Sequence, residues 1–185
     1  MDKDTEHEHE STDTYYLSTY SRDDAPQIVY CLSNKLVAQQ LRMAPIPYSM
    51  SDAMEWLDRL DQETKNPDTA PIRWAPRDVS SRKLIGDLSL RGGTNAGVYS
   101  LGYWLAYEYW GKGIMTRALS KVLRIVRMEI QKVKVVTAGV KENNWGSQRV
   151  LEKHGFRRVG EHVETIEKTI TVWDFELELE SKAVH

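Results

Sequence analysis

The sequence predicts a single α/β domain of the α+β kind, with a mixed, mostly antiparallel sheet and helices on both of its faces. Strand-like segments occur in neighbouring pairs, at residues 83–90 and 98–106 and again near the C-terminus, rather than alternating singly with helices. One segment, residues 114–130, instead repeats its apolar side chains at steps of three and four. A chain of 185 residues supports one core, and we find neither an internal repeat nor a second domain.

The first half of the chain predicts a strand, two helices and an irregular stretch. Residues 15–20 form the expected first strand. A helix is expected to start at Asp23-Asp24-Ala25-Pro26, because an acid caps a helix and proline is tolerated in its first turn. Ser49 to Asp52 has the pattern of the next cap. Residues 66–81 contain three prolines, so they are predicted to be mostly irregular, with one short strand at 72–75.

The second half predicts a hairpin, a long helix and a further hairpin. Residues 83–90 and 98–106 form the first hairpin around a glycine-bearing turn. The amphipathic helix follows, and then a β-branched strand at 133–140. A short helix contains Ser147, Val150 and Leu151, and Gly155 supplies its left-handed cap. The last strands, near 159–163 and up to residue 179, alternate apolar and acidic side chains across a turn near Glu167.

Charge and composition limit the functional classes. Residues 1–13 carry six acids and one lysine and are expected to be a disordered acidic tail, in which His7-Glu8-His9 is a solvated triplet rather than a metal site. The folded domain is expected at 14–180, with a short tail at 181–185. Because the chain is −2 overall and its first 14 residues are −5, the rest carries +3. Such a weak, spread charge favours a small polyanion over duplex nucleic acid.

Location and cysteine chemistry follow from the same composition. No signal peptide and no apolar run of the ~20 residues that a membrane span needs is present. Cys31 is the only cysteine and lies among apolar residues, so we expect a core residue, no disulfide and a cytoplasmic or nuclear protein. The sequence does not predict an oligomeric state.

The chemistry is expected where the strand ending at Ala106 enters the long helix through Gly111-Lys112-Gly113. The first turn of a helix has unpaired N–H groups and a partial positive charge, so it favours an anion, and glycine lets the backbone approach it closely. A nucleotide P-loop does not fit, because its lysine follows the second glycine. A dinucleotide fingerprint does not fit either, because Thr116 replaces its third glycine.

This Gly-x-Gly turn resembles the acetyl-CoA motif of the GNAT superfamily of N-acetyltransferases. Four blocks resemble the branch that acetylates ribosomal-protein N-termini: residues 101–106, 109–113, 144–147 and 150–156. The resemblance as a whole extends over residues 14 to 179. Two positions depart from the pattern. Glu108 stands where Gln or Arg is common, and Arg117 stands where the branch commonly has Glu. These departures concern the substrate more than the coenzyme, because the grip on the coenzyme is mainly through backbone N–H groups.

The resemblance implies a coenzyme site and its residues. The sheet is expected to splay at this site, with acetyl-CoA as co-substrate and no metal. The strand end, Leu105 and Ala106, would hydrogen-bond the pantetheine arm, and the pyrophosphate would lie on the turn formed by Trp110, Gly111, Lys112, Gly113, Ile114, Met115 and Thr116. Asn144 would contact the coenzyme arm, and Ser147 would act as proton donor or hydrogen-bond partner to the leaving thiol. The competing interpretation is that Asn144 and Ser147 only cap their helix.

The base and the acceptor stay open at this level. Asp87, Glu142 and a water chain to solvent are candidates for the base, and His154 is expected to be a helix-end residue. Tyr48 or Trp74 are candidates for the wall of an acceptor pocket. The predicted activity is transfer of acetyl from acetyl-CoA to a primary amine, a protein N-terminus or a small molecule, within a ternary complex. The alternative is a non-catalytic module that binds acyl-CoA as a sensor or scaffold.

Overall fold

The computed structural model describes residues 14–42, 44–66, 70–165 and 169–179. Its strands are β1 (Tyr15–Ser18), β2 (Ile72–Asp78), β3 (Gly86–Gly92), β4 (Val98–Leu105), β5 (Val135–Lys141), β6 (Arg157–Thr165) and β7 (Thr169–Glu178). Its α-helices are α1 (Ala25–Leu32), α2 (Lys35–Ala38), α3 (Met50–Glu63), α4 (Ile114–Glu129) and α5 (Trp145–Glu152). The expected acidic tail with His7-Glu8-His9, the turn near Glu167 and the tail at 181–185 lie outside the described residues.

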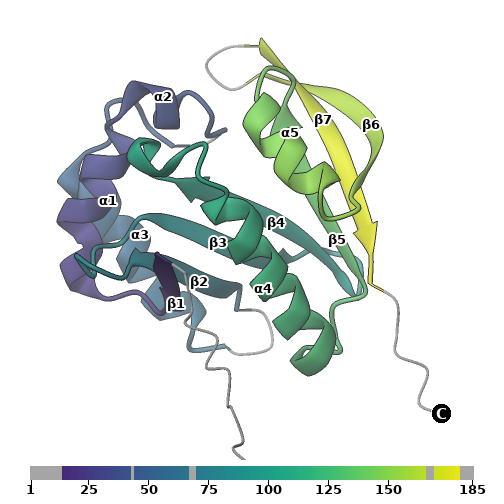
Figure 1. Ribbon diagram of the computed structural model, residues 1–185, viewed down its shortest axis with the longest axis horizontal. Coiled ribbons are helices and arrows are strands. Elements are labelled where there is room, and N and C mark those ends of the chain that lie inside the picture. Colours follow the sequence, from purple (N-terminus) through teal and green to yellow (C-terminus); the bar gives the residue numbers. More distant parts are fainter. Residues whose placement is uncertain (1–13, 43, 67–69, 166–168, 180–185) are drawn as a thin grey trace, which may run out of the picture.

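The strands form one seven-stranded sheet in the order β1-β2-β3-β4-β5-β7-β6 (Figure 1). Every pairing is antiparallel except that of β4 with β5. This arrangement confirms the predicted mixed, mostly antiparallel sheet. In the sequence, α4 lies between β4 and β5. It forms the crossover connection that parallel neighbours need in place of a tight turn.

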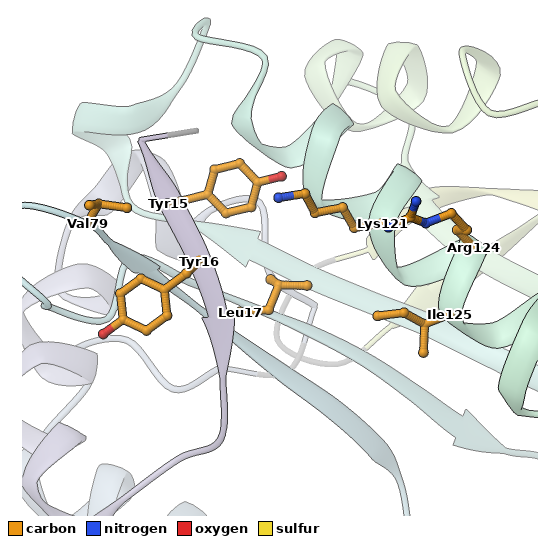
Figure 2. Close-up of a pocket in the computed structure, with 7 residues that line it drawn as sticks. All are labelled: Tyr15, Tyr16, Leu17, Val79, Lys121, Arg124 and Ile125. Atoms are coloured by element: carbon orange, nitrogen blue, oxygen red, sulfur yellow. The ribbon is translucent and has the colours of Figure 1, made fainter. Parts of the chain in front are cut away.

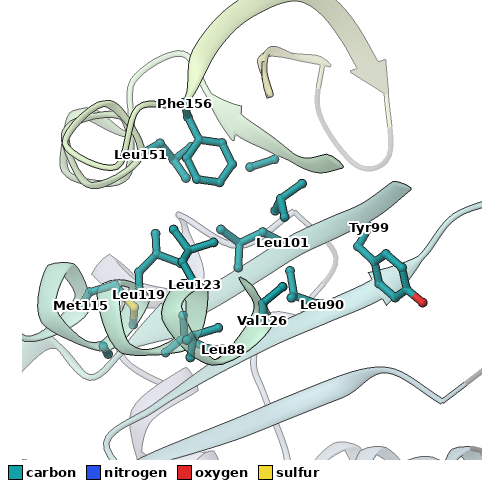
Figure 3. Packing of buried hydrophobic residues seen from close by; sticks show 14 of the residues in the cluster. Leu88, Leu90, Tyr99, Leu101, Met115, Leu119, Leu123, Val126, Leu151 and Phe156 are labelled. Carbon is teal, nitrogen blue, oxygen red and sulfur yellow. The ribbon is translucent and has the colours of Figure 1, made fainter. Parts of the chain in front are cut away.

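Two hydrophobic clusters cover the two faces of the sheet. On one face, α4 and Leu151 of α5 pack on β3, β4 and β5; Figure 3 shows Leu119 and Leu123 of α4 against Leu88 and Leu101 of the strands. On the other face, α1 and α3 pack around Ala75 and Leu84. The apolar stripe predicted for 114–130 is the buried side of α4. Helices therefore lie on both faces, as predicted.

The prediction for residues 66–81 was wrong in part, because β2 extends to Asp78 through Pro76. Pro76 has no N–H, but its carbonyl accepts the hydrogen bond that a strand needs, from the N–H of Ile85 at 2.8 Å. Pairing of β2 with both β1 and β3 fixes an extended backbone that local proline content does not indicate. The short helix α2 was not predicted.

The start of α1 was placed correctly, but its capping was not. Asp24 is the N-cap residue and Pro26 lies in the first turn, yet no side chain caps the helix. The Asp24 carboxylate instead pairs with Arg77 of β2, with an Nη1–Oδ1 distance of 2.7 Å. By contrast, Ser49 and Asp52 form the capping box that the sequence predicts for α3. Among the described residues, no helix combines the length and the apolar character that crossing a bilayer requires.

Candidate active site

The central feature is a gap where β4 and β5 diverge. The two strands pair only at Val98–Val135, Tyr99–Val136 and Ser100–Thr137, although β4 continues to Leu105 and β5 to Lys141. A cavity of about 480 Å³ opens there. The two strands contribute to its lining Leu101, Gly102, Tyr103 and Trp104 from β4, and Ala138, Gly139, Val140 and Lys141 from β5. The predicted splay of the sheet is therefore present.

Backbone alternation decides which groups of β4 face this gap. The N–H of Ala106 donates to the carbonyl of Ile85 on the β3 side at 2.8 Å, so the sheet already uses the amide expected to hold pantetheine. Successive residues of a strand direct their backbone groups to opposite sides. Tyr103 and Leu105 therefore direct theirs toward the gap. The Leu105 carbonyl accepts the indole N–H of Trp110 at 2.7 Å, which folds the turn back on the strand end.

The turn before α4 is open and suited to an anion. Gly111 and Gly113 have positive φ angles of 72° and 69°, a backbone region that favours glycine. A Cβ built at Gly111 meets no atom within 4 Å, so the turn has space on its outer side. Gly113 is the N-cap of α4 and no side chain caps that end, which leaves the N–H groups of Ile114, Met115 and Thr116 without intrahelical partners.

Side chains around the turn have distinct places. Ile114 and Met115 are buried in the core, so only their backbone can face a ligand, whereas Thr116 is half-buried. Lys112 is exposed, with its Nζ 5.4 Å from the centre of the Tyr109 ring. Neither the exposure of residues 111–113 nor their packing conflicts with a phosphate at this turn.

Glu108 and Arg117, the two residues that depart from the family pattern, both form hydrogen bonds here. Glu108 accepts a hydrogen bond from the Tyr30 hydroxyl of α1 at 2.6 Å, so this acid ties the turn to the opposite helical layer. Arg117 donates from Nη1 to the carbonyl of Lys112 at 3.2 Å. Each residue therefore supports the turn; Gly111 stays open, while Arg117 Nη1 lies beside Gly113.

Ser147 lies on α5 and faces the cavity. Its Oγ is 2.6 Å from the hydroxyl of Tyr103 on β4, and the Tyr103 hydroxyl also lies 3.2 Å from the Ser147 carbonyl. Asn144 accepts the Ser147 N–H at Oδ1 (3.1 Å), so it is the N-cap of α5 and lines the cavity as well. Capping and lining are thus compatible for Asn144, while the Ser147 hydroxyl contacts Tyr103 instead of capping.

Tyr103 is a site residue that the sequence analysis missed. Burial raises the pKa of its hydroxyl, and the hydrogen bond with Ser147 offsets only part of this effect. The phenol therefore keeps its proton at neutral pH. The available signal was the alternation of β4, in which an interior tyrosine lies on the same face as Leu101 and Leu105, but the sequence did not show that Ser147 would lie opposite it.

Asp87 approaches the same cavity from the other face of the sheet. It pairs with Trp104 in register, next to the pair of Leu88 and Tyr103, so alternation places Asp87 and Tyr103 on opposite faces. The packing agrees, because Tyr103 contacts the α4-side cluster and Trp104 the α1/α3-side cluster. Both residues reach the cavity because the gap between β4 and β5 joins the two faces.

Three polar groups surround the Asp87 carboxylate. Tyr20 donates to Oδ1 at 2.5 Å, Ser89 donates to Oδ2 at 3.3 Å, and Nη1 of Arg73 lies 3.9 Å from Oδ1. Asp87 is only 6% exposed, and this burial raises the pKa of its carboxyl above the ordinary value of 3.8. The charge of Arg73 opposes the shift most strongly, followed by the two hydrogen bonds.

The remaining candidates divide clearly. Glu142 is exposed and does not line the cavity, while His154 bonds the Val150 carbonyl (2.7 Å) and Ser120 Oγ (2.9 Å) at the end of α5, as a helix-end residue does. Tyr48 lines the cavity and Trp74 does not. Cys31 is buried in the α1 layer, and desolvation raises the pKa of its thiol to about 12, which confirms a core role.

These features fit acetyl-CoA. An uncapped helix start beside an open glycine turn suits a diphosphate, and a strand edge exposed by the splay suits the amides of a pantetheine arm. An opening through the sheet then gives a second molecule access from the α3 side. Such an arrangement fits the class of acyl-CoA-dependent acetyltransferases.

Comparison with known proteins gives the family. The family model described as an acetyltransferase (GNAT) domain matches residues 15–157. The chain therefore belongs to the GNAT acetyltransferase family. A probable N-acetyltransferase of Bacillus subtilis (strain 168), YjcK, is 41% identical over 86 residues, which is 44% of this chain and 46% of the relative. The match thus spans less than half of that curated relative.

Solved structures share the fold at low sequence identity. The ribosomal-protein-S5-alanine acetyltransferase from Vibrio fischeri superposes with a TM-score of 0.77 at 20% identity, covering 92% of this chain and 96% of that one. Spermidine N-acetyltransferase from Vibrio cholerae, in complex with CoA and spermine, gives a TM-score of 0.73 at 19% identity, with coverage of 91% and 97%. These likenesses establish the GNAT fold.

Proposed function

We propose that the protein transfers the acetyl group of acetyl-CoA to a primary amine by direct attack, with Asp87 accepting the amine's proton. The observation that carries the proposal is the cavity through the splayed sheet, which has Asp87 on its α3 side and the Tyr103–Ser147 pair on its α5 side. Proton-accepting and hydrogen-bond-donating groups thus approach one cavity from opposite faces, as a ternary complex requires. The family and the named activities of the relatives support acetyl transfer over a non-catalytic sensor or scaffold.

Coenzyme binding is proposed at the turn and the strand edge. The N–H groups at the start of α4 and the turn at Gly111 and Gly113 would hold the diphosphate, with Lys112 as a mobile counter-charge. Leu105 and Tyr103 would supply the backbone groups for pantetheine, in place of the amide of Ala106. Acetyl-CoA supplies a thioester that a neutral amine can attack.

Asp87 provides the base. A free alkylamine is mostly protonated at pH 7, since its pKa is about 10.4. The ammonium group first loses one proton to solvent, because only the neutral nitrogen can attack. As that nitrogen bonds to the carbonyl carbon, a second proton must leave, and the Asp87 carboxylate can accept it. A carboxyl whose pKa is raised by burial is a stronger base than an exposed one. The charge of Arg73, 3.9 Å away, lowers the pKa of this carboxyl and so favours the ionised form that accepts a proton.

Ser147 and Tyr103 act on the leaving group. When the carbon–sulfur bond breaks, its electron pair remains on sulfur as a thiolate. A thiol has a pKa of about 8.5, below that of a buried tyrosine, so the pair donates a hydrogen bond to the thiolate while keeping its protons. The proton that finally neutralises the sulfur then comes from solvent. The 2.6 Å contact allows the Tyr103 hydroxyl to donate to Ser147 Oγ, and in that arrangement the Ser147 proton is left for the sulfur.

The test is Asp87→Asn, which keeps the shape and can still accept the Tyr20 hydrogen bond. We expect kcat/KM with a panel of amines and peptide N-termini to fall by about 10²–10⁴-fold, with acetyl-CoA affinity unchanged. In the unsubstituted protein the rate should rise with pH as Asp87 loses its proton, with a midpoint above the ordinary carboxyl range, and this limb should vanish in the variant.

Glu142→Gln is the matched control, since this exposed acid does not line the cavity. Full activity of Asp87→Asn would exclude Asp87 as the base and leave a water chain to solvent in that role. Binding of acetyl-CoA by the unsubstituted protein without turnover on any acceptor would favour the scaffold function instead.

A further inference from the structure

A second cavity lies outside the site described above. It occupies about 490 Å³ between β1 and α4 and shares no lining residue with the cavity of the splayed sheet. Figure 2 shows Tyr15 and Leu17 of β1 pointing toward α4, from which Lys121, Arg124 and Ile125 face them. We call it the β1–α4 cleft. Its lining combines an apolar floor, tyrosine rings and two cations, and none of its seven described lining residues is acidic.

One wall of this cleft belongs to a row of cations on α4, defined as Arg117, Lys121 and Arg124. Their spacing of four and then three residues places them on one face of the helix. Arg117 and Lys121 lie over the Tyr15 ring, at 5.9 and 5.0 Å from its centre. The first acid of α4 is Glu129 at its last position. Within α4, therefore, no acid interrupts the cation row.

The cation row also reaches the proposed diphosphate turn. Arg117 Nη1 donates to the Lys112 carbonyl, and a Cβ built on Gly113 would lie 3.2 Å from the same nitrogen. An anion that lay along the row would thus end beside the glycines to which the coenzyme is assigned. Because charges within a Debye length of about 10 Å interact strongly at 0.1 M salt, two anions would not occupy these places independently.

The chain itself provides such an anion. Residues 1–13 carry six acids and one lysine, and the chain continues through Thr14 into Tyr15, which lines the cleft. Thirteen residues can extend over about 40 Å, whereas the cation row spans about 10 Å of helix. A tethered segment has an effective concentration in the millimolar range, so weak charge contacts suffice to hold it.

We propose that the acidic segment 1–13 docks in the β1–α4 cleft and along the cation row, where it competes with the phosphates of acetyl-CoA. The docking itself is independent of the function proposed above, whereas the competition rests on it. The segment would act as an internal mimic of the coenzyme's phosphates and lower the affinity of the protein for acetyl-CoA at low ionic strength.

A nitroxide label on the full chain tests the docking. The label is attached through Thr5→Cys, since Cys31 is buried and not available for labelling. At low salt we expect paramagnetic broadening of the amide signals of residues 121–125, with a strong reduction at 0.5 M salt. Arg124→Glu should remove the broadening, whereas Arg127→Glu, the same charge reversal outside the lining, should retain it.

Absence of broadening at low salt would overturn the docking, and so would equal broadening in Arg124→Glu. The docking would also be overturned if the amide signals of residues 121–125 changed only on addition of unlabelled nucleotide, acidic peptide or a second copy of the chain. The cleft would then be assigned to that occupant. Dilution distinguishes the second copy, because contact within one chain does not depend on concentration.

Acetyl-CoA affinity tests the competition. Changing the six acids of the segment to their amides, in the full chain, should tighten acetyl-CoA binding about 3- to 10-fold at low salt, and 0.5 M salt should abolish the difference. Equal affinities at low salt would overturn the competition. If neither protein bound acetyl-CoA, the proposed function would fail together with the competition, while the nitroxide result would still decide the docking.

Discussion

The two sides of the splayed sheet are built in different ways. The side proposed for the coenzyme is nearly continuous in sequence, since the end of β4, the glycine turn and the start of α4 all lie within residues 103–116. The side proposed for the acceptor is assembled from distant segments, with Tyr20 before α1, Arg42 before α3, Arg73 on β2 and Asp87 on β3. Dispersed elements can change in sequence without altering a binding segment that is contiguous. We therefore expect substitutions on the side proposed for the coenzyme to disturb acetyl-CoA binding more than substitutions on the side proposed for the acceptor.

The largest effect on acetyl-CoA affinity is expected at the turn. Gly113→Ala forces a side chain into a left-handed backbone conformation, which costs about 1–2 kcal/mol, and displaces the diphosphate from the helix start. We expect acetyl-CoA affinity to fall about 100-fold, or about 2.7 kcal/mol, measured by titration calorimetry. Gly155→Ala is the matched control, because its φ of 82° imposes a similar strain away from the site. Equal losses of affinity in the two variants would assign the effect to folding.

The leaving-group pair should give a smaller effect, confined to turnover. Ser147→Ala and Tyr103→Phe each remove one hydroxyl of the 2.6 Å contact, and kcat should fall about 10- to 100-fold with acetyl-CoA affinity nearly unchanged. Because the two hydroxyls act as a unit, the double variant should be little worse than either single one. Unchanged turnover in Ser147→Ala would remove this residue from the mechanism.

The smallest effect is expected at the ion pair of Arg42, on the side proposed for the acceptor. Arg42 pairs with Glu164 of β6 at 2.7 Å and so joins the α2–α3 connection to the C-terminal hairpin across the cavity. Arg42→Gln should raise the KM of the acceptor a few-fold and leave acetyl-CoA affinity unchanged, since half-exposed ion pairs contribute about 1 kcal/mol or less. Steady-state kinetics with each substrate varied in turn would show the difference.

Arg22→Gln provides the comparison for that variant, because Arg22 forms an exposed pair with Asp58 on α3 outside the cavity lining. An increase in the acceptor KM of the same size in both variants would indicate a general effect on α3. A change in acetyl-CoA affinity in Arg42→Gln would contradict the separation of the two sides.

Prediction from sequence succeeded where the signal is local. The stripe of α4, the hairpin of β3 and β4, and the capping box at Ser49 depend on residues a few positions apart, and each is present. The prediction failed for residues 76–78, because their pairing with β1 and the bridge between Arg77 and Leu84 outweigh the local effect of Pro76. Asp87 remained one of three candidate bases for a similar reason, since its burial depends on Tyr20 and Arg73.

The amino-acid order by itself determined the fold class and the turn at Gly111 and Gly113, because helix periodicity and glycine conformations are fixed by near neighbours. Only the tertiary structure decided that Tyr103 meets Ser147, 44 residues further along the chain, and that Asp87 shares their cavity from the opposite face. The divergence of β4 from β5 creates that cavity, and it depends on how two strands separated by α4 pack between their neighbours.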